Sequence, residues 1–254
     1  MQYIYFVGTA GSGKSSLVYA FREWMTLQGL DCITVNLDPG AEDIPYEIDV
    51  DIRDWVKVSE VMEEYELGPN GAQVVCADLM AMNAKDLATA IEGFKTNYVL
   101  IDTPGQIELF AFRRSSEAII DTLGREDAYL IYLTDPHLAK TPSGFVTSLM
   151  LCATVFFRFN LPFLNVLSKA DMLKEEEFDQ IVQWSEDPDA LNAALSDEHL
   201  EAKTVMNIEL FKAMENIGMF REIIPVSATE KFGIEDMYNA VQESFQGGED
   251  LRSD

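Results

Sequence analysis

Apolar residues are grouped along the chain in short runs, separated by longer segments of mixed polarity. The runs are rich in Val, Ile, Leu and Tyr, and most are too short to form independent helices. They cover residues 3–7, 32–37, 98–102, 128–134, 162–168 and 221–227. Runs of this kind are typical of strands that are buried on both faces of a sheet.

The segments between these runs have helical character. Residues 14–29, "KSSLVYAFREWMTLQG", end on Gly29, a residue type that favours the position after a helix C-terminus. Alternating strands and helices imply right-handed crossovers and a mostly parallel sheet with helices on both faces. We therefore predict a three-layer α/β fold in which residues 1–254 form a single domain.

Two regions interrupt this alternation. Residues 39–97 combine an acidic segment, a turn-rich stretch and a helical run that extends to about Lys95. Residues 174–216 are expected to form an acidic helical insertion that is interrupted at Asp187-Pro188. The last residues, 246–254, are expected to be frayed.

Composition limits the partners that the chain can have. It has 44 acidic and 18 basic residues, a formal net charge of −26, which repels the phosphates of DNA and RNA. We therefore expect no direct binding to nucleic acids. The chain shows no signal peptide and no apolar run of about 18 residues, so we predict a cytoplasmic protein that does not enter a membrane. Its three cysteines and two histidines show no metal-ligand spacing, which argues against a zinc site.

The strongest motif is "GTAGSGKS" at residues 8–15, which matches G-x-x-x-x-G-K-[ST] between a predicted strand and a predicted helix. Its glycines let backbone N–H groups approach a phosphate closely, and the following helix directs its positive end toward the same anion. The lysine reaches the β- and γ-phosphates, and the hydroxyl of Ser15 can ligate Mg²⁺. The predicted nucleotide-binding residues are Gly8, Gly11, Ser12, Gly13, Lys14, Ser15 and Ser16.

An acidic residue at the end of a predicted strand supplies the next part of the site. In "VLIDTPGQIELF", residues 99–110, Asp102 is placed to hold Mg²⁺, directly or through water. The N–H of Gly105 is expected to be free for the γ-phosphate. Gln106 is a candidate for orienting the attacking water, and Glu108 follows two residues later.

The stretch "NVLSKADML", residues 165–173, indicates a base site. Lys169 and Asp171 follow a strand, and an aspartate here accepts hydrogen bonds from the N1–H and N2 amine of guanine, which adenine does not offer. The lysine stem can cover the base. Ser227 and Ala228 end the last predicted strand, where the Ala228 N–H suits the guanine O6. Ser227 has a simpler alternative role, which is to cap the following turn or helix.

Asp38 ends the second predicted strand and has two interpretations. Its carboxylate can act on the attacking water or on the Mg²⁺ shell. The alternative is an Asx turn before Pro39-Gly40. The later aspartates are assigned to caps or to solvent; these are Asp49, Asp51 and Asp54.

In their order along the chain, these motifs resemble those of the GPN-loop GTPases. The resemblance rests on "GTAGSGKSS", "NLDPGAE", "DIRD", "GPNG", "DTPGQIELF", "LSKAD" and "VSA", and it extends from Gly8 to at least Ala228. By composition "GPNG", residues 68–71, is an ordinary turn, and only its place in this series gives it a function. A short chain without an extended C-terminal tail is similar to the archaeal members.

The resemblance implies a P-loop NTPase fold, GTP or GDP and Mg²⁺ as ligands, and a homodimer. The loop Gly68, Pro69 and Asn70 would reach into the partner subunit's site, with Asn70 near the γ-phosphate and the attacking water. The positions that match the family's hydrolytic and Mg²⁺-linked residues are Asp38, Asp102, Gln106 and Glu108, and those of its guanine site are Lys169 and Asp171. Eukaryotic relatives are linked to RNA polymerase assembly and nuclear import, which makes polymerase assembly only a weak expectation here.

Two positions depart from patterns of other P-loop proteins. Ser168 stands where Ras-like GTPases have an asparagine whose amide braces the P-loop. We therefore expect that brace to be missing and nucleotide affinity to be weaker. Thr9 stands where septum-site ATPases have an extra lysine, which argues against that branch.

Three functions are compatible with these motifs: GTP hydrolysis, phosphorylation of a small molecule, and nucleotide-switched binding of an unidentified protein partner. P-loop kinases usually carry an arginine-rich lid, but residues 174–216 contain no arginine and only Lys174, Lys203 and Lys212. "TVFFRF", residues 154–159, is a candidate partner groove, although a buried helix or strand explains it better.

Overall fold

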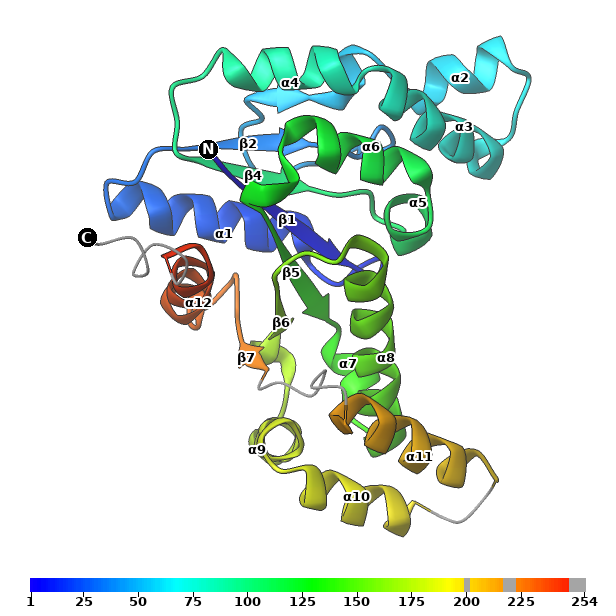
Figure 1. The fold of residues 1–254 in the computed structure, drawn as a ribbon, viewed down its shortest axis with the longest axis vertical. Coiled ribbons are helices and arrows are strands. Elements are labelled where there is room, and N and C mark those ends of the chain that lie inside the picture. Colours follow the sequence, from blue (N-terminus) through cyan, green and yellow to red (C-terminus); the bar gives the residue numbers. More distant parts are fainter. Residues whose placement is uncertain (199–201, 217–222, 247–254) are drawn as a thin grey trace.

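The computed structural model describes residues 1–198, 202–216 and 223–246. Its centre is a sheet of seven strands in the order β3-β2-β4-β1-β5-β6-β7 (Figure 1). Each neighbouring pair of these strands is parallel, which confirms the predicted α/β fold. The strands are β1 (Gln2–Gly8), β2 (Cys32–Asn36), β3 (Val50–Asp51), β4 (Tyr98–Asp102), β5 (Ala128–Thr134), β6 (Phe163–Leu167) and β7 (Ile224–Pro225).

Helices cover both faces of the sheet. α1 and α12 lie on one face, and α3 to α6 together with α8 lie on the other (Figure 1). The helices are α1 (Lys14–Leu27), α2 (Val58–Glu64), α3 (Pro69–Met82), α4 (Ala84–Glu92), α5 (Ile107–Ala111), α6 (Arg114–Leu123), α7 (Pro136–Ala139), α8 (Pro142–Phe159), α9 (Glu175–Glu186), α10 (Pro188–Asp197), α11 (Ala202–Asn216) and α12 (Ile234–Gln246). Short 3-10 helices are η1 (Ile52–Asp54), η2 (Arg125–Asp127) and η3 (Ala170–Met172).

The apolar runs of the sequence follow from this layering, because alternate strand residues point to opposite faces. In β1, Ile4 and Phe6 pack with α1 and α12, whereas Tyr3, Tyr5 and Val7 pack with the helices of the other face. All five side chains are buried. A strand that is covered on both sides therefore shows no polar alternation.

Two strands differ from the prediction. β3 was not predicted, because it has only two residues and one of them is acidic; it pairs with the end of β2. β7 covers Ile224–Pro225 and is shorter than the predicted run 221–227, of which residues 221–222 lie outside the described part of the chain. A proline is tolerated in β7 because this strand is at the edge of the sheet.

The regions that interrupt the alternation fold into helices. Residues 39–97 contain η1, α2, α3 and α4, and α2 packs on α3 through Val61 and Cys76. Residues 174–216 contain α9, α10 and α11, with a break at Asp187, whose carboxylate accepts a hydrogen bond from the next turn. Most of the segment predicted to be frayed, residues 247–254, lies outside the described residues.

α8 is the one described helix that is long and apolar enough to cross a membrane, by length and composition alone. Half of its window is buried inside the protein, including Phe145, Val155 and Phe159, which is typical of a core helix. The motif "TVFFRF" lies at its C-terminal end, with Phe159 in the core and Phe157 61% exposed.

The carboxyl ends of the parallel strands meet along one edge of the sheet, where α/β proteins bind their ligands. β1 lies between β4 and β5, with Phe6 opposite Asp102 and Gly8 opposite Leu133. The motifs that follow β1, β2, β4 and β6 therefore come together at this edge.

Candidate nucleotide site

Glycines shape the loop between β1 and α1. Gly11 and Gly13 have positive φ angles of 76° and 93°, which residues with side chains seldom adopt. A Cβ on Gly8 would lie 2.7 Å from the Ser12 hydroxyl and 2.9 Å from the Leu133 carbonyl oxygen. These glycines allow the tight turn that leads into the N-terminus of α1, where the helix dipole attracts anions.

Lys14 lies across this loop and is 5% exposed. Its Nζ donates hydrogen bonds to the carbonyl oxygens of Gly8, Thr9 and Gly105 at 3.1, 2.9 and 3.2 Å. Burial lowers the pKa of the ammonium group, while nearby carboxylates oppose that shift. The lysine thus connects the loop after β1 to the turn after β4 and brings its charge to the edge of the sheet.

A cavity of about 320 Å³ lies beside this lysine. Its wall combines the loop after β1, Asp38 after β2, the turn after β4 and the loop after β6. The lining residues are Gly11, Gly13, Lys14, Ser15, Ser16, Asp38, Ala41, Asp102, Thr103, Gly105 and Lys169. Successive backbone N–H groups and lysine charges around one hollow suit the phosphates of a nucleotide.

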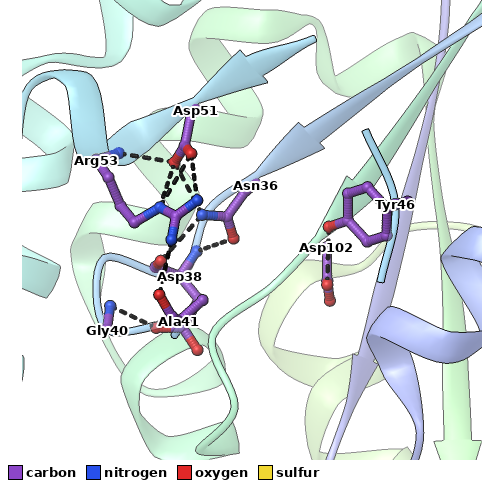
Figure 2. A network of polar contacts seen from close by, with 8 residues as sticks. All are labelled: Asn36, Asp38, Gly40, Ala41, Tyr46, Asp51, Arg53 and Asp102. Carbon is purple, nitrogen blue, oxygen red and sulfur yellow. Dashed lines mark hydrogen bonds and ion pairs between the residues drawn. The ribbon is translucent and has the colours of Figure 1, made fainter. Parts of the chain in front are cut away.

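Asp102 ends β4 and is 3% exposed. Its Oδ2 accepts a hydrogen bond from the Tyr46 hydroxyl at 2.9 Å, and its Oδ1 is buried without a hydrogen-bond partner among the described residues (Figure 2). Burial raises the pKa of this carboxyl, whereas Ser15, Tyr46 and Lys14 favour the charged form. Tyr46 is a contact that the sequence motifs did not indicate.

These groups fit a divalent cation. Mg²⁺ prefers oxygen ligands, and in phosphate sites one or two protein oxygens suffice because water and phosphate complete its shell. The unpartnered oxygen of Asp102 and the hydroxyl of Ser15 supply such ligands at the cavity wall. Within the described residues no group of three or more Asp, Glu, His or Cys side chains is arranged to hold a metal. Asp102 and Ser15 are the residues that would hold a cation here, with phosphate and water completing its shell.

Asp38 forms the Asx turn of one interpretation and lines the phosphate cavity, while its action on water or Mg²⁺ stays a prediction. Its Oδ1 accepts a hydrogen bond from the Gly40 N–H at 2.9 Å, which is the Asx turn. Its Oδ2 accepts a hydrogen bond from the Gly105 N–H at 2.9 Å, at the wall of the phosphate cavity. The sequence predicted a free Gly105 N–H, and this prediction is wrong. The N–H already donates to the carboxylate of Asp38.

A polar network holds the backbone on either side of Asp38 (Figure 2). The Asn36 side chain accepts a hydrogen bond from the Asp38 N–H and donates one to Asp51, both at 2.9 Å. Arg53 forms an ion pair with Asp51 at 2.6 Å and donates to the Ala41 carbonyl oxygen at 2.8 Å. Although burial raises it, the pKa of Asp51 is held below its ordinary value by Arg53 and Asn36. The predicted capping role of Asp51 is confirmed, because its carboxylate accepts a hydrogen bond from the Arg53 N–H at the start of η1. The sequence did not indicate the other bonds of this network.

A second, smaller cavity of about 130 Å³ adjoins the first and shares Gly13, Ser16 and Lys169 with it. It includes Asp171 and Ala228, two of the residues predicted to contact guanine. The lining residues are Gly13, Ser16, Leu17, Ser168, Lys169, Asp171, Met172, Val226, Ala228 and Thr229. Apolar side chains beside one carboxylate are suited to a planar base with hydrogen-bond donors at its edge.

Two serines near the base cavity, Ser227 and Ser168, form hydrogen bonds that the sequence alone did not determine. The buried Ser227 hydroxyl accepts a hydrogen bond from the Glu230 N–H at 3.0 Å, so its side chain caps a turn, which is the simpler alternative. The Ser168 hydroxyl donates to the Ser12 carbonyl oxygen at 2.7 Å. The asparagine amide is absent, but the Ser168 hydroxyl bonds to the P-loop in its place. The expected loss of nucleotide affinity stays a prediction.

The remaining catalytic candidates lie away from both cavities. Gln106, Glu108 and Asn70 are exposed, and none of them is on either cavity wall. Gln106 precedes α5, and Glu108 lies in its first turn. Their catalytic roles stay predictions.

The Gly-Pro-Asn stretch forms the start of a helix. Gly68 caps α3 and Pro69 is its first residue, where a missing N–H leaves no bond unmade. Pro69 also lines a surface groove of about 660 Å³ together with Gly40 and Arg53. The stretch thus lies near the segment that carries Asp38, but Asn70 does not line the phosphate cavity of its own chain.

The glycine-rich loop before α1, its buried lysine and the acidic end of the neighbouring strand define the class of the protein. They are the parts of a P-loop nucleoside triphosphatase, set on the carboxyl edge of a parallel sheet. Comparisons with known proteins agree, since residues 6–247 match a family described as conserved hypothetical ATP-binding proteins.

Relatives that are similar in sequence belong to a narrower class, the GPN-loop GTPases. GPN-loop GTPase PAB0955 of Pyrococcus abyssi is 31% identical over 250 residues, which are 95% of this chain and 96% of that protein. Its crystal structure in the apo form is similar with a TM-score of 0.87 and 30% sequence identity, over 96% of this chain and 97% of that chain. GPN-loop GTPase 2 of Schizosaccharomyces pombe is 35% identical over 170 residues, 66% of this chain.

The chain belongs to the GPN-loop GTPase family, as the order of its motifs predicted. The matched regions span only 54% of the fission-yeast relative and 57% of GPN-loop GTPase QQT1 of Arabidopsis thaliana. This chain therefore corresponds to little more than half of those relatives, and to nearly all of the Pyrococcus protein.

Proposed function

We propose that the chain hydrolyses GTP to GDP and inorganic phosphate with Mg²⁺ as cofactor. The observation that supports this is the pair of adjoining cavities, with Lys14 and Asp102 on the wall of the larger one and Asp171 on the wall of the smaller one. A carboxylate accepts from the two neighbouring donors of guanine, whereas adenine does not present such a pair. The base cavity thus favours GTP, although the matched family is described as ATP-binding.

In this proposal the loop amides, the dipole of α1 and Lys14 bind the phosphates and stabilise the charge that develops on them. Asp102 and Ser15 hold Mg²⁺, which neutralises phosphate charge when bound. Asp38 is the best-placed group to accept a proton from the attacking water, because it alone of the predicted catalytic residues lines the phosphate cavity. Gln106 and Glu108 contribute only after the start of α5 turns toward the phosphates.

We also propose that a second copy of the chain supplies Asn70, since this residue is exposed and lines neither cavity of its own chain. We propose that the bound nucleotide controls the binding of a protein partner. This part of the proposal rests on the resemblance to relatives that act in assembly. Phosphorylation of a small molecule is not proposed, because α9 to α11 carry no arginine with which to close over phosphates.

The test reverses the hydrogen bonding at Asp171. Asp171→Asn places an amide donor where guanine presents its own N2 donor, whereas xanthine presents a carbonyl oxygen there. We expect kcat/KM for GTP to fall about a hundredfold or more while turnover of XTP rises, measured as phosphate release. Asp189→Asn, at an exposed position of α10, is the control and should behave as wild type. Wild type that prefers ATP, or an Asp171→Asn variant that keeps its GTP turnover, would contradict the proposal.

A further inference from the structure

The hydrogen bond between Tyr46 and Asp102 joins two segments that are 56 residues apart. Tyr46 lies between β2 and β3, on the same connection as Asp38, and its ring is directed at the end of β4 (Figure 2). The hydroxyl donates to Asp102 Oδ2 at 2.9 Å, at the wall of the phosphate cavity. The contact is therefore placed to influence what Asp102 does.

Packing holds the Tyr46 ring in place. Tyr46 is 7% exposed and belongs to the buried cluster between the sheet and the helices α1 and α12. A ring in a close-packed cluster presents its hydroxyl in one direction. A phenol is protonated at neutral pH, so the Tyr46 hydroxyl acts as the donor to the Asp102 carboxylate.

This contact restricts the carboxylate of Asp102. Rotation about the Cβ–Cγ bond would break the hydrogen bond to Oδ2, so Oδ1 also keeps one direction. Oδ1 is buried without a hydrogen-bond partner among the described residues, and Ser15 is near enough to favour the charged carboxylate. The tyrosine thus decides which oxygen of Asp102 remains for a cation.

We propose that Tyr46 is a positioning residue for the divalent cation, because it holds Asp102 with Oδ1 directed at the metal. A phenol suits this task, since a neutral donor orients the carboxylate and leaves its negative charge for the cation. A lysine or arginine in the same place would neutralise that charge. The inference rests on the use of Mg²⁺ in the proposed function.

The experiment measures release of a fluorescent GDP analogue from the full chain at increasing Mg²⁺. For Tyr46→Phe we expect release in EDTA to match wild type. The Mg²⁺ concentration that half-maximally slows release should rise about tenfold or more, as for other groups that orient a metal ligand. Tyr46→Met fills much of the same space without a hydroxyl, and we expect the same rise in the half-maximal Mg²⁺ concentration. It replaces Tyr46→Phe if that variant does not fold.

Tyr19→Phe is the matched control. Tyr19 is 38% exposed on α1, and its hydroxyl donates to Glu23 rather than to the site. Its Mg²⁺ dependence should equal that of wild type.

A double-mutant cycle separates positioning from general stability. In Asp102→Asn an amide replaces the carboxylate that Tyr46 orients, so adding Tyr46→Phe should change the Mg²⁺ dependence by no more than about twofold. A purely structural tyrosine would lower the melting temperature of Tyr46→Phe and leave its Mg²⁺ dependence at the wild-type value. That result, or equal shifts in both backgrounds, overturns the inference.

The outcome for wild type distinguishes the two proposals. If release from wild type does not depend on Mg²⁺, the proposed cofactor is wrong and the inference fails with it. If wild type depends on Mg²⁺ and Tyr46→Phe follows the same curve, only the role of Tyr46 is wrong.

Discussion

Single side chains at this site connect segments that are far apart in the sequence. The Ser168 hydroxyl donates to the Ser12 carbonyl oxygen at 2.7 Å and lies 3.1 Å from the Thr134 carbonyl oxygen, and 156 residues separate it from Ser12. Ser168 is 2% exposed. One buried donor therefore fixes the P-loop relative to the ends of β5 and β6.

Ser168→Ala removes this donor and leaves the buried Ser12 carbonyl without its side-chain partner. We expect the affinity for GDP to fall about three- to tenfold, which corresponds to a hydrogen bond of ~1 kcal/mol. Isothermal titration calorimetry measures the effect. Ser196→Ala removes an exposed helical hydroxyl on α10 and serves as the control. Equal affinities for Ser168→Ala and wild type would show that the brace does not support nucleotide binding.

The sequence predicted those residues of the site whose chemistry depends on local spacing. Gly13 and Lys14 act within one loop, and Asp102 ends an apolar strand, so their order along the chain was sufficient. The hydrogen bonds of Tyr46 and Ser168 join residues that are 56 and 156 positions apart in the sequence. No local pattern encodes such contacts, and the sequence therefore gave no sign of them.

At the scale of elements, the connection from β2 to β3 is attached to its surroundings at several points, three of which lie beside the phosphate cavity. Asp38 bonds to the Gly105 N–H, Tyr46 bonds to Asp102, and the Ala41 carbonyl oxygen accepts from Arg53. Two of these points lie at the turn after β4, which also forms the wall of the phosphate cavity. The position of this connection and the shape of the site are thus coupled.

Arg53→Ala removes the ion pair with Asp51 and the hydrogen bond to Ala41, so one attachment is lost. We expect the free energy of unfolding to fall by about 1–3 kcal/mol, because Asp51 keeps a partly buried charge without its main partner. GTP turnover should fall as well, since the backbone around Asp38 is less well held. Urea denaturation and phosphate release measure the two effects.

Lys212→Ala provides the comparison for Arg53→Ala. Lys212 forms an exposed ion pair with Glu209 on α11, and such pairs contribute about 0–1 kcal/mol. If Arg53→Ala is no less stable and no slower than Lys212→Ala, the network does not support the site.

Element prediction succeeded where burial left a clear pattern. The apolar runs located β1, β2, β4, β5 and β6, because strands covered on both faces need no polar residues. β3 has only two residues, and one of them is Asp51, so it forms no apolar run in the sequence. "GPNG" has the composition of a turn, yet Pro69 fits the first turn of α3 because that position needs no N–H.

At the scale of the whole molecule, the order of the strands explains why separate motifs form one site. β4 and β5 flank β1, and β2 lies beyond β4, so the loops after these strands meet at one edge. The sequence predicted parallel strands but not their order, which depends on pairing between distant segments. If the proposed function is correct, the site is complete only when a second copy of the chain supplies Asn70.

Mixing two inactive variants tests that requirement. In Asn70→Ala the phosphate cavity is intact, and in Asp102→Asn the residue Asn70 is intact. A mixed dimer has one site with both groups, so an equal mixture should recover about a quarter of the wild-type GTP turnover. The readout is phosphate release after the variants are mixed and allowed to exchange.

Each variant measured alone is the control for the mixture. Activity that equals the average of the two separate variants would mean that Asn70 does not act across a dimer. A monomeric wild type in sedimentation experiments with GTP would lead to the same conclusion.

The hydrogen bonds of Lys14 affect how inactive variants should be chosen. Its ammonium group bonds to three carbonyl oxygens from two loops and acts as a non-covalent cross-link between them. Replacing Lys14 leaves these acceptors without their side-chain partner, so we expect it to lower the stability of the protein as well as the proposed affinity for phosphate. A Lys14 variant therefore mixes a folding defect with a binding defect. Asp102→Asn, which keeps the shape of the side chain, is the cleaner inactive reference for this chain.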